Sequence, residues 1–163
     1  MPMPDAEPIP VLARRVVELF TARGFTLATC ESLTGGLIGA TITSVPGASA
    51  IYRGGFITYA SDLKVRWAGV DADLVASRGV INEPTALQMA RGVRDASGAD
   101  VAVACTGVAG PQGQDGAEPG TVVITCVTAG HTTVSTYTFA GDREQVRRQT
   151  VEQALHLLRD YLD

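Results

Sequence analysis

The chain has 163 residues and a formal net charge of −4, from 13 Lys and Arg against 17 Asp and Glu. This length predicts one domain with its own core, and the acidic balance argues against a nucleic-acid partner held through its phosphates. No apolar stretch reaches the roughly 18 residues that cross a bilayer, so we expect a cytoplasmic protein without membrane contact.

The first half of the chain alternates helical and strand patterns. Apolar positions at helical spacing predict a helix over residues 11–20. We expect residues 1–9 to be a flexible lead-in and residues 10–163 to form a single domain. The further elements that we predict here are a buried strand over 26–31, a turn over 32–36, a helix over 37–43, a strand over 56–60 and a helix containing Lys64. Ser61 or Asp62 could cap that last helix.

The second half ends in a predicted hairpin and a long helix. The predicted elements are a helix from Asp71, a longer helix after Asn82-Glu83-Pro84, a strand over 100–106, a loop over 107–120, strands over 121–128 and 132–139, and a helix over 142–161. Helical crossovers favour parallel pairing early in the chain, whereas the hairpin must be antiparallel. The order therefore predicts an α/β fold with a mixed sheet of about five strands between helical layers.

Cysteine and histidine limit the chemistry. Cys30, Cys105 and Cys126 lie in apolar, strand-like runs, which predicts buried free thiols rather than disulfides. His131 lies in a turn and His156 in the last helix, and neither stands at zinc-ligand spacing from another ligand. We therefore expect no metal site and no catalytic triad built on histidine.

Lys64 is the only lysine in the chain, against twelve arginines. A bias towards arginine codons with one leftover lysine on a solvated helix face would explain it. The alternative is chemical, because arginine keeps its proton at any accessible pH, whereas burial can tune a lysine amine into a base. A serine nucleophile can use such a lysine where no histidine is suitable.

Four further segments carry candidate site residues. Ser32 lies at a strand-to-helix turn, where its hydroxyl could act as a nucleophile and the following amides could bind an anion, although Ser32 or Thr34 could equally be a helix cap. Thr106-Gly107-Val108-Ala109-Gly110-Pro111 follows an apolar strand, and its glycines allow close approach to a ligand or simply a tight turn. Arg143 could bind a phosphate or pair with a surface carboxylate. Tyr59 could assist the chemistry or be a half-buried strand residue.

Several motifs occur together in a recognisable order. They are Glu31-Ser32-Leu33-Thr34-Gly35-Gly36, Pro46-Gly47-Ala48-Ser49, Gly55-Phe56-Ile57-Thr58-Tyr59 with Lys64, Thr106-Gly107-Val108-Ala109-Gly110-Pro111, Gly120-Thr121-Val122 and Gly141-Asp142-Arg143. This set closely resembles the CinA C-terminal domain family from about Val11 to Leu162. Stand-alone members of that family include nicotinamide mononucleotide (NMN) deamidases.

The resemblance implies a three-layer α/β/α sandwich and hydrolysis of NMN to nicotinate mononucleotide and ammonia, with no metal or organic cofactor. It implies Ser32 as the nucleophile, Lys64 as its base and Tyr59 as an aid to proton transfer. The substrate-binding residues that it implies are Glu31, Thr34, Gly35, Gly36, Ser49, Thr106, Gly107, Gly110 and Arg143. The amides of either 34–36 or 107–110 would stabilise the oxyanion.

The chain departs from the family pattern in the loop over 112–120, which forms the expected lip of the pocket. Three other functions stay open at this point: a non-catalytic nucleotide-binding module, a competence-associated interaction domain, and an amidase for a related substrate. The resemblance also implies a homo-oligomer, a dimer or larger.

Overall fold

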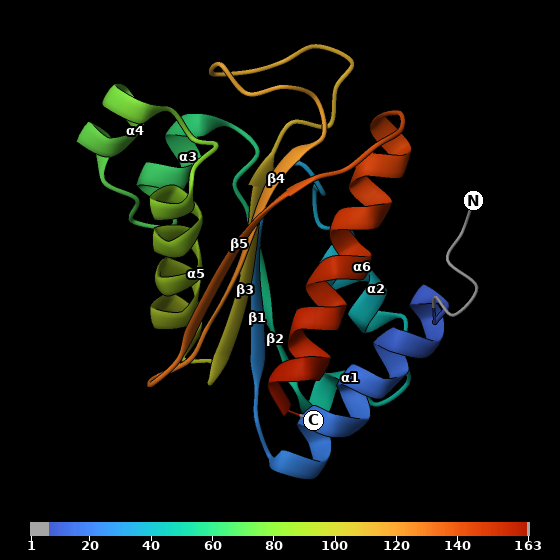
Figure 1. Cartoon of the computed structure of the whole chain (residues 1–163). Coiled ribbons are helices and arrows are strands. Elements are labelled where there is room, and N and C mark those ends of the chain that lie inside the picture. Colours follow the sequence, from blue (N-terminus) through green and yellow to red (C-terminus); the bar gives the residue numbers. More distant parts are fainter. Residues whose placement is uncertain (1–6, 163) are drawn as a thin grey trace.

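A single five-stranded sheet organises the computed structural model, which describes residues 7–162. The strands are β1 (Leu27–Glu31), β2 (Tyr52–Ile57), β3 (Val101–Gly107), β4 (Thr121–Val127) and β5 (Thr132–Thr138). The helices are α1 (Ile9–Arg23), α2 (Leu37–Thr43), the 3-10 turn η1 (Ala48–Ala50), α3 (Ser61–Arg66), α4 (Ala72–Arg78), α5 (Glu83–Ser97) and α6 (Arg143–Leu162). Figure 1 shows α1, α2 and α6 on one face of the sheet and α3, α4 and α5 on the other, which confirms the predicted α/β/α sandwich.

The sheet is mixed, as predicted. Its strand order is β2-β1-β3-β4-β5, with β1 parallel to both β2 and β3, and with antiparallel pairing from β3 to β4 and from β4 to β5. The parallel strands β1, β2 and β3 therefore end at the same edge of the sheet. The segments that follow them begin at Ser32, Thr58 and Val108, so the topology brings these residues to one place.

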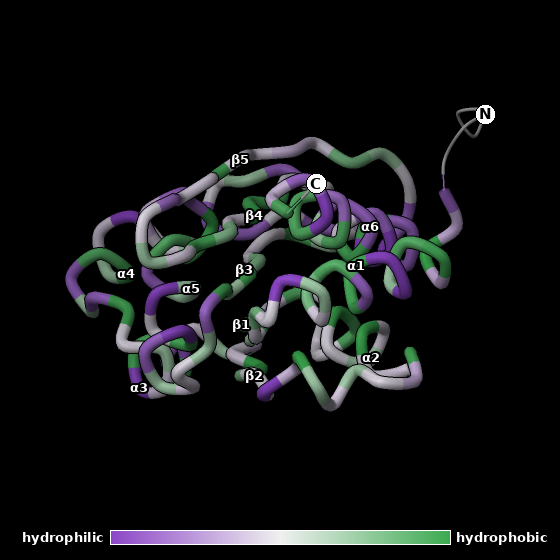
Figure 2. The backbone as a smooth tube through the Cα atoms, turned by 90° about the horizontal axis from the view of Figure 1, so that it is seen from below, coloured by the Kyte–Doolittle hydropathy of each residue, from purple (hydrophilic) through white to green (hydrophobic). Residues whose placement is uncertain are grey.

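The two faces of β3 differ in side-chain size. Val101, Val103 and Cys105 pack towards α1, α2 and α6, whereas Ala102 and Ala104 pack towards α5. The small side chains of β3 face α5, and α5 also packs closely on the segment after α3, where a Cβ added at Gly92 would clash with the backbone of Ala68. Two clusters of buried apolar residues cover the two faces of the sheet, and Figure 2, seen from below, shows the strands between α1, α2 and α6 on one side and α3, α4 and α5 on the other. Their burial supplies most of the stabilisation of the fold.

Local signals explain the helix ends. Asn82 caps α5 by accepting a hydrogen bond from the Thr85 amide at 2.9 Å, and the helix ends at Gly98 with a left-handed φ of 68°. Asp71 caps α4 in the same way. The predicted cap of α3 by Ser61 or Asp62 is wrong, because Ala60 occupies the cap position and no side chain bonds there.

The predicted boundaries differ most from the structure at the second strand and at the start of the first helix. The second strand begins at Tyr52 rather than at residue 56 and ends at Ile57, so Tyr59 lies in the connection to α3 and not in a strand. The register of β2 shifts where Arg53 bulges out of the pairing with β1. Of the predicted lead-in over 1–9, residues 1–6 lie outside the described residues, and Ile9 already belongs to α1.

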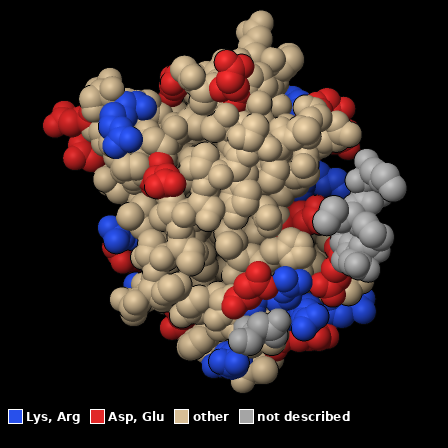
Figure 3. Space-filling model, in the orientation of Figure 1, with Lys and Arg blue, Asp and Glu red and all other residues tan. Residues whose placement is uncertain are grey.

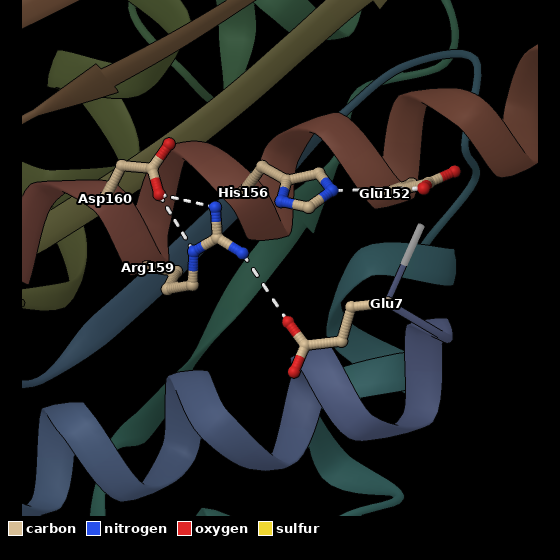
Figure 4. Close-up of polar contacts among 5 residues, drawn as sticks. All are labelled: Glu7, Glu152, His156, Arg159 and Asp160. Atoms are coloured by element: carbon tan, nitrogen blue, oxygen red, sulfur yellow. Dashed lines mark hydrogen bonds and ion pairs between the residues drawn. The ribbon is translucent and has the colours of Figure 1, made fainter. Parts of the chain in front are cut away.

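Charge is scattered over the surface, and α6 carries ion pairs with its own residues and with Glu7. Figure 4 shows Arg159 of α6 contacting Asp160 at 2.7 Å and Glu7 at 3.5 Å, with His156 3.8 Å from Glu152. Exposed pairs of this kind contribute about 0–1 kcal/mol. Charged residues are sparse over β5 in Figure 3, and the strand itself contains none. Within residues 7–162 no helix combines the length and apolar character needed to span a membrane.

Candidate active site

A pocket of about 140 Å³ lies at the edge where the three parallel strands end. Its walls come from the turn after β1, the segment after β2, the loop after β3 and the start of α6. The residues that line it are Ser32, Leu33, Tyr59, Val80, Thr106, Gly107, Val108, Ala109, Gly110, Gln112, Gly113, Gln114 and Arg143.

Ser32 and Lys64 meet at this pocket. The Lys64 side chain is 1% exposed, and its Nζ lies 3.0 Å from Ser32 Oγ and 2.7 Å from the Thr58 carbonyl oxygen. Ser32 itself is 7% exposed and lines the pocket. The solvated helix face that would have explained Lys64 as a compositional remainder is therefore excluded.

Burial lowers the pKa of the Lys64 amine below its ordinary value. The groups nearest to Lys64 carry little negative charge that would raise its pKa again. The thiols of Cys30 and Cys105 have pKa values raised to about 11 and about 12 by burial, so both are uncharged at neutral pH. Asp115 is the remaining group that favours the protonated lysine. The site thus lowers the energetic cost of forming the neutral amine, the form that can accept a proton.

The backbone around Ser32 is held tightly. The Ser32 amide donates to the Cys105 carbonyl at 3.1 Å, and the Gly35 amide closes the turn by donating to the Ser32 carbonyl at 3.0 Å. Gly35 and Gly36 adopt left-handed φ angles of 59° and 101°, which favours glycine at both positions. Within residues 7–162 the Leu33 amide donates to no protein acceptor, and Leu33 lines the pocket.

Glu31 has a different role from the one expected. Its buried carboxylate accepts hydrogen bonds from the Thr34 hydroxyl at 2.7 Å, the Ile38 amide at 2.8 Å and the Gly39 amide at 3.0 Å. It therefore occupies the N-terminus of α2, where we expected amides to bind substrate. The Gly35 amide donates within the turn, and Glu31, Thr34, Gly35 and Gly36 do not line the pocket, so their expected role in substrate binding stays a prediction.

The loop after β3 forms the opposite wall of the pocket. Thr106 donates its hydroxyl to the Val80 carbonyl at 2.8 Å, and the Asp115 carboxylate accepts from the Val80 amide at 3.1 Å. Gly107 ends β3 and Gly110 has a left-handed φ of 93°. Thr106, Gly107 and Gly110 all line the pocket, in agreement with their predicted position.

Arg143 and Tyr59 form the rim. The Arg143 guanidinium donates to the Gly110 carbonyl at 2.8 Å and to the Tyr59 hydroxyl at 2.9 Å. The Tyr59 side chain is 59% exposed and makes no hydrogen bond to Ser32 or Lys64. The structure thus brings Tyr59 to the pocket without the contact that proton transfer needs.

Ser49 lies away from the pocket. It is exposed in η1, which precedes the first residue of β2, whereas the pocket lies beyond the last residue of that strand. A six-residue strand is about 20 Å long. The expected role of Ser49 at the substrate is therefore not supported by this arrangement.

The sequence reasoning missed Arg147. Its Nε donates to the Leu33 carbonyl at 3.0 Å and its Nη2 donates to the Thr34 carbonyl at 3.1 Å. No local pattern signals such a contact between residues more than 110 positions apart. The Thr58 carbonyl that holds Lys64 was also missed, since main-chain acceptors carry no residue type.

Within residues 7–162 no cluster of three His, Cys, Asp or Glu side chains could hold a metal ion. The chemistry that this arrangement allows is nucleophilic attack by Ser32 with Lys64 as its base.

Comparison with known proteins agrees with this architecture. The model of the CinA C-terminal domain matches residues 10–162. A CinA-like protein from Syntrophotalea carbinolica is 41% identical over 152 residues, which cover 93% of this chain and 37% of that protein. The chain therefore spans little more than a third of the length of this relative.

Solved structures of similar size match almost completely. The competence damage-inducible protein A from Klebsiella pneumoniae has a TM-score of 0.93 at 33% identity, covering 96% of this chain and 98% of that one. The competence/damage inducible protein CihA from Agrobacterium tumefaciens has a TM-score of 0.88 at 38% identity, covering 92% and 93%. Sequence and structure together show that this chain belongs to the CinA C-terminal domain family.

Proposed function

We propose that the chain hydrolyses the carboxamide of NMN to nicotinate mononucleotide and ammonia through an acyl-enzyme on Ser32. The observation that carries this proposal is the 3.0 Å contact between Ser32 Oγ and the buried Lys64 Nζ. The resemblance of the motifs to NMN deamidases supplies the substrate. The names of the relatives support the family alone.

The first half of the reaction makes the acyl-enzyme. Neutral Lys64 keeps its donation to the Thr58 carbonyl and uses its lone pair to accept the Ser32 proton. Ser32 Oγ bonds to the amide carbon, and the carbonyl oxygen becomes an oxyanion near the Leu33 amide. Lys64 then gives its proton to the departing nitrogen. The C–N bond breaks, ammonia leaves and a nicotinoyl ester remains on Ser32.

The second half hydrolyses this ester. Lys64 accepts a proton from a water molecule as that water attacks the ester carbon. The tetrahedral intermediate collapses, the proton returns to Ser32 Oγ, and nicotinate mononucleotide leaves with a carboxylate. Both halves use the same base and the same oxyanion donors, so no metal or organic cofactor is needed in this scheme.

The size of the pocket supports this substrate. A cavity of about 140 Å³ suits the pyridine ring and its amide, while the ribose phosphate would extend towards the rim. Arg143 is the cation at that rim, and a guanidinium binds phosphate well. We assign it to the substrate phosphate, which requires exchange or sharing of its bonds to Gly110 and Tyr59.

The direct test incubates the protein with NMN and measures ammonia and nicotinate mononucleotide, with Ser32→Ala as the control. Turnover that disappears in Ser32→Ala is the expected result. Binding of NMN without product in the unmodified protein would favour the nucleotide-binding module instead. Comparison with nicotinamide riboside tests Arg143, because Arg143→Gln should weaken use of NMN and leave use of the riboside unchanged.

A further inference from the structure

We propose that Arg147 is a positioning residue that polarises the Leu33 amide, the oxyanion donor of the Ser32 turn, an inference that rests on the proposed acyl transfer. Arg147 reaches the turn from α6, far along the chain. Its two hydrogen bonds go to main-chain carbonyls and not to a carboxylate. Within residues 7–162 no acidic side chain forms an ion pair with it, so its charge is directed into the peptide groups of the turn.

The first polarised peptide joins Leu33 to Thr34. The Nε of Arg147 donates to the Leu33 carbonyl at 3.0 Å. A carbonyl that accepts a charge-assisted hydrogen bond draws electron density from its peptide nitrogen and makes the N–H on that nitrogen a stronger donor. In this peptide that N–H belongs to Thr34, which has no protein acceptor within the described residues and does not line the pocket, so this peptide contributes only through the dipole of the turn.

The second route by which Arg147 polarises the turn passes through two peptide groups and ends at the Leu33 amide. The Nη2 of Arg147 donates to the Thr34 carbonyl at 3.1 Å, which strengthens the Gly35 amide as a donor. The Gly35 amide in turn donates to the Ser32 carbonyl at 3.0 Å. That carbonyl shares its peptide with the amide of Leu33, a residue that lines the pocket. Each step adds about 10–30% to the strength of the next hydrogen bond.

Only a planar guanidinium can serve both routes at once. Its Nε and Nη2 are held apart at the spacing that successive carbonyls require, whereas a lysine ammonium is a single point charge. The same two bonds restrain the backbone of the turn, so the amides are aligned before the substrate arrives. Prealigned donors stabilise an oxyanion without reorganisation during the reaction.

The test replaces Arg147 with Gln, with Arg148→Gln as the matched control. Arg148 is the exposed neighbour on the same helix, and its substitution removes the same charge without touching the turn. We expect Arg147→Gln to lower kcat for NMN by about 10- to 100-fold, since loss of an entire oxyanion donor costs about 10²–10³-fold. KM should change by less than about threefold, and Arg148→Gln should stay within about twofold of the unmodified protein.

Three further readouts separate polarisation from a general loss of structure. The pH at which kcat/KM reaches half its maximum should stay the same in Arg147→Gln, because Lys64 sets it. The affinity of Ser32→Ala for NMN should not fall when Arg147→Gln is added. Arg147→Lys should recover only part of the rate, because its ammonium can satisfy one carbonyl strongly. Full activity of Arg147→Gln, or a loss confined to KM, would overturn the proposal.

A second substrate keeps the test independent of NMN. Acylation of Ser32 by an activated phenyl ester, followed by mass spectrometry, needs the nucleophile and the oxyanion donors but not nucleotide recognition. If the unmodified protein is acylated and does not hydrolyse NMN, the proposed substrate is wrong and the acylation rates still decide the role of Arg147. A chain that shows neither reaction would overturn both proposals.

Discussion

Glu31 and Lys64 are two ionisable side chains buried to the same degree beside the same turn, and their surroundings differ sharply. Each is 1% exposed. The Glu31 carboxylate accepts three hydrogen bonds at 2.7–3.0 Å, two of them from amides at the start of α2. The Lys64 amine contacts one hydroxyl and one carbonyl, and no carboxylate forms an ion pair with it within residues 7–162.

The difference separates stability from reactivity. A buried ion costs several kcal/mol unless hydrogen bonds or an opposite charge compensate it. Glu31 is compensated, and in return it holds α2 and the turn in place. Lys64 is compensated less well as a cation, so the neutral amine is favoured and becomes available as a base. The Glu31 carboxylate stabilises the fold, whereas the Lys64 amine is available as a base.

The largest expected effect is on the Lys64 side of this comparison. Lys64→Met should lower kcat for NMN by at least about 10³-fold, as expected for loss of the base that activates a nucleophile. Its free energy of unfolding should stay equal or rise, because a poorly compensated charge is replaced by an apolar side chain of similar volume. Steady-state kinetics and urea unfolding measure both. A Lys64→Met protein with substantial activity would contradict the role of Lys64 as base.

Glu31 should show the opposite behaviour in unfolding experiments. Glu31→Ala removes the acceptor of two buried amides and one hydroxyl, so we expect a loss of about 3 kcal/mol in the free energy of unfolding. Glu31→Gln should lose less, because its amide oxygen still accepts a hydrogen bond. Glu144→Gln, an exposed carboxylate on α6, is the control and should stay within about 0.5 kcal/mol. If Glu31→Ala were as stable as the unmodified protein, the proposed structural role of Glu31 would be wrong.

The pH dependence of stability provides a finer comparison. The pKa of Lys64 is lowered in the folded protein, so at a pH between this value and its ordinary value the folded state has lost a proton that the unfolded state keeps. Stability should therefore rise with pH across this window, by at most about 1.4 kcal/mol per pH unit for one proton. Subtracting the profile of Lys64→Met isolates this effect. A difference that is flat or falls with pH in that window would contradict the lowered pKa.

The smallest expected effect concerns Tyr59. Because its hydroxyl contacts Arg143 and neither Ser32 nor Lys64, Tyr59→Phe should change kcat by less than about threefold. Kinetics with NMN measure this directly. A loss of 10²-fold or more would restore the expectation that Tyr59 takes part in proton transfer, and would require the rim to rearrange when substrate binds.

The fold was largely predictable because its strongest signals are local. The apolar runs of β1 and β3, the caps Asn82 and Asp71, and the glycine after α1 all act within a few residues of the element that they define. The start of β2 was missed because Arg53-Gly54-Gly55 has the composition of a turn. In the structure Arg53 bulges, and a Cβ at Gly55 would clash with Thr29 of the neighbouring strand.

The site was predictable where composition restricts the choice and unpredictable where tertiary structure decides. With no suitable histidine and a single lysine, Lys64 was a natural candidate base. The capping role of Glu31 was hidden, since the amides that donate to its carboxylate lie seven and eight residues further on and beyond two glycines with left-handed φ. Whether Arg147 and Ser49 lie near the pocket depends on which ends of distant helices and strands are neighbours. This follows only from the folded topology.

The buried thiols beside the active site can report when the structure around them opens. Cys30 Sγ lies 3.6 Å from Thr58 Oγ1 and Cys105 Sγ lies 3.2 Å from Thr34 Oγ1, each fully buried and with its pKa raised by burial. A protonated, inaccessible thiol reacts poorly with alkylating reagents until the surrounding structure opens. These cysteines therefore act as internal reporters, whose rate of alkylation measures how often the segments around the Ser32 turn and Thr58 come apart.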